Sequence, residues 1–130
     1  MIKFAYTILY VQNVAKTIQF YEQAFGFQRK FLTEDNAYGE LLTGDTILSF
    51  ASWDQAGSNL HEGFTPSNLN DKPFGIEIAI TTEDVEETLK AALAAGATLT
   101  ESPKTKPWGQ VVAYVRDFDG FLIEICTPMG

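Results

Sequence analysis

Residues 107–126 read PWGQVVAYVRDFDGFLIEIC, and this stretch decides the fold. Two runs of β-branched and aromatic residues flank a tight turn at Asp119-Gly120, which predicts two paired strands. The second run, residues 121–126, is apolar except for Glu124. A carboxylate buried without a partner is costly or becomes neutral. Glu124 is therefore expected to face water, a partner, or a cavity that uses it.

The composition indicates one compact domain over residues 1–130 and excludes several classes of protein. Hydrophobic residues make up 45% of the chain and charged residues 20%, which is typical of a folded globular protein. A net charge of −8 argues against a nucleic-acid binder and would attract cationic ligands. Cys126 is the single cysteine, so one chain cannot form a disulfide framework or a thiolate zinc site.

Two further observations bear on location. The segment 1–4 lacks the apolar region of a secretory signal, and no run reaches 18 apolar residues. We therefore expect a cytoplasmic protein with no membrane partner.

The order β-α-β-β-β occurs twice along the chain. Strands, a capped helix with an apolar stripe, and turn residues recur in the same sequence. In the first half the strands are expected at 2–11, 27–33, 37–43 and 46–52, with a helix from Asn13 to Gly26. In the second half they are expected at 74–81, 97–101, 109–115 and 121–127, with a helix from Asp84 to Gly96.

The two halves can be superimposed residue by residue. Val14 matches Val85 at a separation of 71, and Gly26 matches Gly96 at a separation of 70. The stretch 38–40 (Tyr-Gly-Glu) then matches 108–110 (Trp-Gly-Gln). Because the turn 44–45 falls on the turn 119–120, Ser49 falls on Glu124.

These elements predict an α+β fold. Two βαβββ modules, residues 1–52 and 74–128, would form a curved mixed sheet with a concave cavity. The loop 53–73, rich in Gly, Ser, Asn, Asp and Pro, would join them.

The sequence resembles the vicinal oxygen chelate superfamily, which includes glyoxalase I, extradiol dioxygenases, and fosfomycin and bleomycin resistance proteins. The likeness rests on the opening FAYTILYVQNVAKTIQFYEQAFGF (residues 4–27) and the closing PWGQVVAYVRDFDGFLIEI (residues 107–125). The closing DFDGFLIEI is similar to the DPDG-x-x-[IV]-E strand of the family, with Phe118 where proline is usual.

The resemblance implies four metal-ligating positions, one from the first and one from the last strand of each module. Carried onto this sequence, they are Tyr6, Ser49, Glu77 and Glu124. Tyrosine and serine are poor ligands for nickel, zinc or manganese, so we expect no resident metal cofactor. The alternative is a weakly held divalent ion on Glu77 and Glu124.

Glu77 and Glu124 have alternative explanations that need no ligand. They could form structural ion pairs, for example with Arg29 or Arg116, or lie in water at a strand edge. If both enter one cavity without a metal, mutual repulsion should raise at least one pKa. Cys126 is expected to be a small core residue, and His61, the only histidine, is expected to be a solvated loop residue.

The resemblance to resistance proteins also implies aromatic faces that sandwich a flat ligand. Candidates for that role are Tyr6, Phe50, Trp53 and Trp108. The full set of expected ligand-binding residues is Tyr6, Ser49, Phe50, Trp53, Glu77, Trp108, Tyr114 and Glu124. Stacking together with negative charge suits a cationic, aromatic small molecule.

Two functional hypotheses follow. The first is a homodimeric small-molecule-binding protein that sequesters its ligand, as bleomycin and mitomycin resistance proteins do. The second is an enzyme: a glyoxalase I-like lyase or a dioxygenase with a divalent metal, or a metal-free isomerase or lyase. In the metal-free version Glu77 or Glu124 would be the general base and Tyr6 the proton donor.

Overall fold

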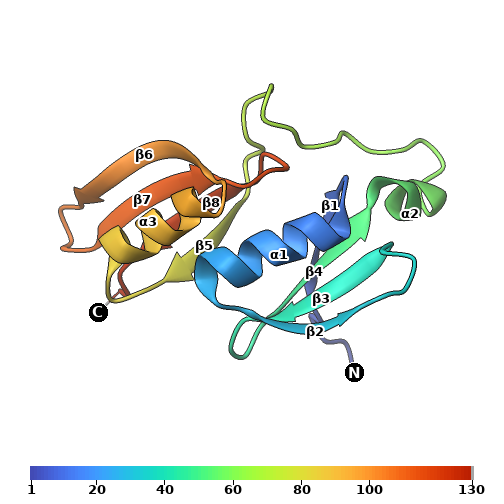
Figure 1. Cartoon of the computed structure of the whole chain (residues 1–130), viewed down its shortest axis with the longest axis horizontal. Coiled ribbons are helices and arrows are strands. Elements are labelled where there is room, and N and C mark those ends of the chain that lie inside the picture. Colours follow the sequence, from blue (N-terminus) through green and yellow to red (C-terminus); the bar gives the residue numbers. More distant parts are fainter. Residues whose placement is uncertain (130) are drawn as a thin grey trace. The chain divides into compact units, whose positions relative to one another are not determined.

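The computed structural model describes residues 1–129. It divides into two compact units, unit 1 with Met1–Glu22 and Gly26–Pro66, and unit 2 with Gln23–Phe25 and the chain from Ser67 onward. Each unit contains a four-stranded mixed sheet with a helix against one face (Figure 1). The predicted α+β class and the repeated β-α-β-β-β order are confirmed.

Unit 1 carries the first sheet, in the order β1-β4-β3-β2. Strand β1 runs parallel to β4, and the β4–β3 and β3–β2 pairs are antiparallel. The elements are β1 (Thr7–Val11), α1 (Val14–Phe25), β2 (Gln28–Leu32), β3 (Tyr38–Leu42), β4 (Ile47–Ser52) and the short helix α2 (Trp53–Ser58).

Helix α1 begins and ends where its sequence predicts. The Asn13 side chain accepts the backbone N–H of Lys16, and Gly26 adopts the left-handed conformation with φ 71°. Its apolar stripe is buried against the sheet, and a Cβ on Gly39 of β3 would collide with Ile18. This close approach explains why a glycine interrupts an otherwise bulky strand.

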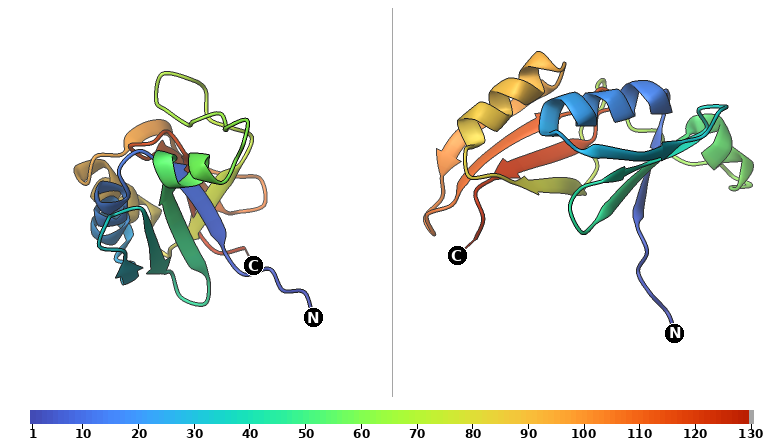
Figure 2. Two further views of the ribbon diagram at one scale, coloured as in Figure 1. Left: turned by 90° about the vertical axis from the view of Figure 1, so that its right-hand side faces the viewer. Right: turned by 60° about the horizontal axis from the view of Figure 1, so that its bottom comes forward.

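Unit 2 carries the second sheet, in the order β5-β8-β7-β6, with β5 parallel to β8 and the other pairs antiparallel. Helix α3 covers one of its faces (Figure 2). The elements are β5 (Glu77–Thr81), α3 (Val85–Ala94), β6 (Thr98–Thr105), β7 (Val111–Arg116) and β8 (Leu122–Cys126).

The turn between β7 and β8 is built around a buried carboxylate. Asp117 is 1% exposed, and its Oδ1 accepts the backbone N–H groups of Asp119 and Phe121, each at 2.9 Å. Gly120 has φ 87°, and a Cβ there would lie 2.6 Å from the backbone of Asn68. Arg116 donates to the carbonyls of Gly120 and Asn68. The DFDG sequence thus ties this turn to the chain that enters unit 2.

The strand registers confirm the superposition at the four family positions. Ile8 lies opposite Ser49, and Ala79 lies opposite Glu124. Tyr6 is two residues before Ile8, and Glu77 is two residues before Ala79. Tyr6 therefore corresponds to Glu77, and Ser49 to Glu124.

One part of the superposition is wrong. Glu40 lies opposite Ser49, whereas Tyr114 lies opposite Glu124. Residues 38–40 therefore correspond to 112–114, and the stretch 108–110 lies before β7. The shared glycine misled the alignment, because Gly39 permits helix packing while Gly109 is a turn residue with φ 94°.

The segment that joins the modules and the strand starts also differ from expectation. Residues 53–58 form α2 instead of a loop, because Ser52 caps the backbone N–H of Gln55. Strands β1 and β5 begin later than predicted, at Thr7 and Glu77, which pair with Leu48 of β4 and Leu122 of β8. Within residues 1–129, no helix has the length and apolar character needed to cross a bilayer.

Candidate functional site

Each sheet has one face against its helix and one face without a helix, which we call the open face whether or not its side chains reach solvent. The alternation of side chains along each strand assigns residues to the two faces. In unit 1 the open face includes Ile8, Ser49 and Glu40, which lie in one cross-strand row. In unit 2 the equivalent row is Ala79, Glu124 and Tyr114. The polar positions singled out by the sequence are thus on the faces that the helices leave uncovered.

Phe50 lies on the other face. It follows Ser49 on β4, is fully buried, and packs against Tyr21 of α1 with ring centroids 5.3 Å apart. Consecutive residues of one strand cannot both face a ligand, so the structure places Phe50 in the core of unit 1.

The structure brings Glu77 and Glu124 together on the open face of unit 2. Glu77 precedes Ala79, the register partner of Glu124, by two residues, so both carboxyl groups extend from the same face of neighbouring strands. Burial, followed by hydrogen bonding to Glu124 and the charge of Glu124, raises the pKa of Glu77 above its ordinary value. When the pair holds one proton, Glu77 is therefore the group that carries it, and Glu124 is ionised.

Glu124 has further partners that keep it ionised. Tyr114 donates its hydroxyl to Glu124 Oε1 at 2.9 Å. Burial acts to raise the pKa of Glu124, but hydrogen bonds from Cys126, Tyr114 and Glu77 and the charge of Lys106 outweigh it, so the pKa is lowered. In return, the hydrogen bond to Glu124 and burial raise the pKa of Tyr114 to about 12.

No arginine neutralises this acid pair. Arg29 pairs with Glu22 at 2.9 Å in unit 1, and Arg116 donates to the two turn carbonyls. The structural ion pairs considered from the sequence are therefore not formed with either arginine. The two glutamates form an acidic pair and not half of a salt bridge.

Cys126 follows Glu124 by two residues and shares its face. It is 3% exposed, and burial together with the neighbouring carboxylates raises the pKa of its thiol to about 11. A thiol with this pKa stays protonated near neutral pH, so it is neither a nucleophile nor a ready metal ligand.

Trp108 lies in the turn that leads into β7 and is 66% exposed. Its indole N–H donates to Gln110 Oε1 at 2.8 Å, and the Gln110 amide donates to the carbonyl of Thr127, just beyond β8. The ring is thus held near the start of β7 and the end of β8, and β8 is the strand that carries Glu124. A large aromatic surface remains open to solvent.

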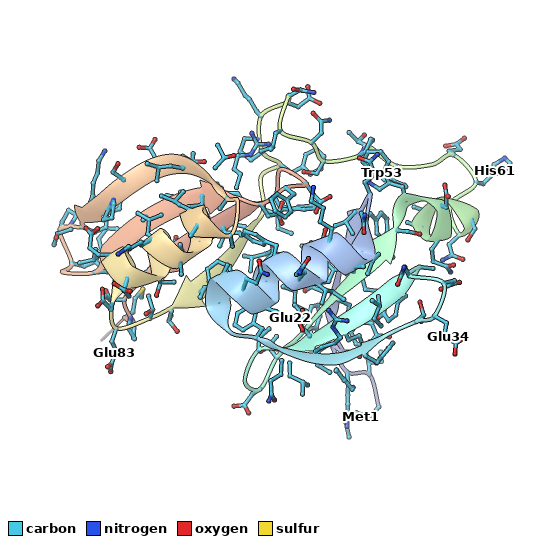
Figure 3. All side chains as sticks on the ribbon, viewed as in Figure 1. Met1, Glu22, Glu34, Trp53, His61 and Glu83 are labelled. Carbon is cyan, nitrogen blue, oxygen red and sulfur yellow. The ribbon has the colours of Figure 1, made fainter. Side chains whose placement is uncertain are left out.

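The remaining expected residues lie in unit 1. Tyr6 is 43% exposed, whereas Ser49 is fully buried and its Oγ makes no hydrogen bond of acceptable geometry. Trp53 opens α2 with its indole nitrogen buried and unpaired, and His61 is an exposed residue of the chain after α2 (Figure 3). That Tyr6 and Ser49 share a hollow with Glu77 and Glu124 stays a prediction.

The open face of unit 1 contains a polar cluster that the sequence analysis missed. Glu40 is 6% exposed, accepts the Tyr38 hydroxyl at 2.6 Å, and lies 3.4 Å from the Lys30 ammonium group. Burial and the hydrogen bond to Glu40 raise the pKa of Tyr38 to about 12, although Ser49 lies close enough to oppose this rise. Glu124 was identified because it is a carboxylate within an otherwise apolar strand. Glu40 shows the same pattern in β3, so this signal could also have identified it.

Two hollows differ in how many of their polar side chains already form hydrogen bonds to the protein backbone. The larger, about 530 Å³ in unit 1, is lined by capping and turn residues. Asn13 and Ser52 there cap helices, and Asp35 accepts the backbone N–H of Ala37. The smaller, about 260 Å³ in unit 2, is lined by Tyr114, the hydroxyl partner of Glu124. The smaller hollow is therefore the better candidate site.

Unit 2 by itself supplies few donors for a zinc or nickel ion. Such a site needs about three good ligands, and the family positions in unit 2 provide two carboxylates, those of Glu77 and Glu124. In residues 1–129, no group of three or more His, Cys, Asp or Glu side chains has an arrangement that could hold a metal.

These features define a class of protein: two βαβββ units whose helix-free sheet faces carry polar residues on the parallel strand pairs. Residues 3–125 match the Glyoxalase/Bleomycin resistance protein/Dioxygenase superfamily. The chain belongs to this superfamily.

Individual relatives agree with this assignment. The chain is 28% identical to a putative lactoylglutathione lyase of Brassica oleracea var. gemmifera over 95% of its own length, but spans only 43% of that protein. It is also 28% identical to a probable lactoylglutathione lyase of Vibrio parahaemolyticus, covering 92% of this chain and 86% of that one.

A solved structure shares the fold. A glyoxalase-related enzyme from Fulvimarina pelagi superimposes with a TM-score of 0.81 at 19% identity, covering 98% of this chain and 89% of that one. At this identity the likeness shows the fold alone.

Proposed function

We propose that the protein binds a small molecule without covalent change, on the open face of unit 2. The observation that carries this proposal is that Glu77 and Glu124 extend from the same face of neighbouring strands, where each shifts the pKa of the other. Two carboxylates side by side repel each other when both are ionised, and no arginine relieves them. A ligand with a basic amine would replace the proton of the pair and form charge-assisted hydrogen bonds with both groups.

The surroundings of the pair support a ligand that is also aromatic. The exposed ring of Trp108, held by Gln110, offers a flat apolar surface. Stacking on Trp108 and a cationic centre at the two glutamates would together suit such a ligand. The net charge of −8 would further attract such a ligand.

Benzylamine is a minimal probe of this proposal, and benzyl alcohol is its neutral control. We expect benzylamine at about 10 mM to shift the backbone amide signals of β7 and β8 in a nuclear magnetic resonance titration. Benzyl alcohol should shift them less. Glu124→Gln should weaken benzylamine binding about fivefold or more, because one charge-assisted bond is lost. Absence of any shift, or shifts that E124Q leaves unchanged, would refute the proposal.

A second candidate is a metal-free acid–base enzyme, and the opposite pKa directions of Glu77 and Glu124 favour it. Such a split is how two carboxyl groups come to act as acid and base. In this version ionised Glu124 is the general base. The expected result is activity that Glu124→Gln abolishes while probe binding persists. A lactoylglutathione lyase assay, with and without added Ni²⁺, tests the activity suggested by the names of the relatives.

We also propose that the protein forms a homodimer. Met1, Ile2 and Phe4 are almost wholly exposed, and Tyr6 and Ile8 on the same segment are about two-fifths exposed. A second chain could cover these apolar side chains, which are costly to leave in water. Sedimentation velocity should give about twice the mass of one chain, and Phe4→Asp should shift the molecule toward the monomer.

A further inference from the structure

The hollow of about 260 Å³ in unit 2 is lined by two positively charged side chains, Lys104 and Lys106, that have no role in the binding of an amine by the acidic pair. At its inner side Tyr114 donates to Glu124, so the hollow adjoins the proposed site. Its other walls come mainly from β6 and the residue just beyond it. The lining residues are Glu101, Ser102, Lys104, Lys106, Val112 and Tyr114.

The lysines face this hollow because β6 is irregular. The pairing of β6 with β7 shifts register between Leu99 and Glu101 and again between Glu101 and Lys104. Pro103 lies inside the second shift, and proline is tolerated at such a bulge on an edge strand. After the shift, Lys104 of β6 lies opposite Val112 of β7. Val112 in turn lies opposite Cys126 of β8, which is on the open face. The bulge thus turns a lysine toward the open face.

Neither ammonium group is used in an ion pair. Within residues 1–129, neither Lys104 nor Lys106 lies within salt-bridge distance of a carboxylate, in contrast to Arg29 beside Glu22 and Lys30 beside Glu40 in unit 1. Lys106 is close enough to act on the charge of Glu124, but it forms no salt bridge with it. The lining therefore contains two unpaired ammonium groups against one carboxylate, that of Glu101.

We propose that Lys104 and Lys106 form an anion subsite, so that the ligand of unit 2 is amphoteric. Its amine meets Glu77 and Glu124, and its carboxylate or phosphate meets the two lysines across Tyr114. This inference rests on the proposed function, because it takes the acidic pair as the site of the amine. It narrows the ligand class from aromatic cations to small amphoteric molecules such as amino-acid derivatives.

The charge pattern explains why an amphoteric ligand is preferred. A purely cationic ligand gains at the acidic pair but is repelled by the two ammonium groups a few residues away. A purely anionic ligand has the opposite difficulty. A ligand that carries both charges satisfies both ends, and each end neutralises protein charge that is otherwise uncompensated.

The test compares two probes that differ only in the anionic group, benzylamine and 4-(aminomethyl)benzoate. We expect the benzoate to bind the wild-type protein about fivefold more tightly, in line with one or two partly exposed ion pairs. In a Lys104→Gln/Lys106→Gln double variant this ratio should fall to about one. Lys90→Gln on α3 is the matched control, because Lys90 is exposed and does not line the hollow. Acetate and inorganic phosphate, added as competitors, show which anion the subsite prefers.

The outcomes separate the two proposals. If benzylamine binds and needs Glu124, but the benzoate has no advantage or keeps it in the double variant, the anion subsite is refuted and the proposed function stands. If neither probe perturbs β7 or β8, the proposed function fails and this inference with it. Thermal unfolding of each variant confirms that it is folded, which is expected because Lys104 is exposed and Lys106 is partly exposed.

Discussion

The open faces of the two units share one strand arrangement and differ in the charges on it. In unit 1 the buried carboxylate, Glu40, is on the third strand of the repeat opposite Ser49, and Lys30 compensates it. In unit 2 the carboxylate, Glu124, is on the fourth strand opposite Tyr114, and its neighbour is another glutamate. In both units a tyrosine hydroxyl donates to the carboxylate.

This difference separates a structural cluster from a candidate functional one. The unit 1 cluster is complete within itself, because its carboxylate has both a hydroxyl donor and a cation. The unit 2 cluster holds two carboxylates that raise and lower each other's pKa, and Lys106, whose charge acts on Glu124, forms no salt bridge with it. Uncompensated charge beside a hollow is what a binding site offers to a ligand.

The largest effect is expected at the glycines of the two turns that precede the last strand of each unit, Gly120 in unit 2 and Gly44 in unit 1. Gly120→Ala should lower the free energy of unfolding by about 3 kcal/mol, because its Cβ would meet the backbone of Asn68 at a left-handed φ. Gly44→Ala, where no atom lies within 4 Å, should cost only about 1 kcal/mol. Urea unfolding measures both. Equal costs would show that the turn of unit 2 is not packed as described.

The next largest effect concerns the two carboxylates. Glu40→Gln should destabilise the protein by about 1 kcal/mol, since Lys30 loses its partner near a buried group. Glu124→Gln should change the free energy of unfolding by less near pH 7, because the weaker hydrogen bonds are offset by the removed repulsion of Glu77 and an acceptor for Tyr114 remains. If both substitutions were equally destabilising, the contrast between the clusters would be wrong.

The acidic pair should also be visible in the pH dependence of stability. The pKa of Glu77 is raised in the folded state, so the folded protein holds this proton more tightly than the unfolded chain. Its stabilising contribution is full below the ordinary pKa of 4.5 and is lost as the pH rises through the raised pKa. Urea unfolding from acid to neutral pH should show this loss in the wild type and not in Glu77→Gln. A constant difference between them would contradict the raised pKa of Glu77.

The smallest effect tests the reach of Lys106. Lys106→Gln should raise the pKa of Glu124 slightly, because this lysine is the weakest of the causes that lower it. Lys90→Gln should leave that pKa unchanged. Carboxyl ¹³C titration by nuclear magnetic resonance measures the pKa directly. A Glu124 pKa that does not respond to Lys106 would place the ammonium group farther from the acidic pair than the structure does.

The local sequence determined the elements and their repetition. Asn13, Asp84 and Gly26 predicted helix ends correctly, because caps depend on a few neighbouring residues. The carboxylate of Glu124 in an apolar strand correctly indicated an unusual environment, since burial of an unpaired charge is costly.

Tertiary structure decided the register, the partners and the charges around the site. The bulges of β6 and the pairing of Glu40 with Lys30 depend on which strands lie side by side. A pKa likewise depends on neighbours that are distant along the chain, such as Glu77 and Glu124. Sequence patterns record the period of each strand, but only the assembled sheet brings charges from different strands together.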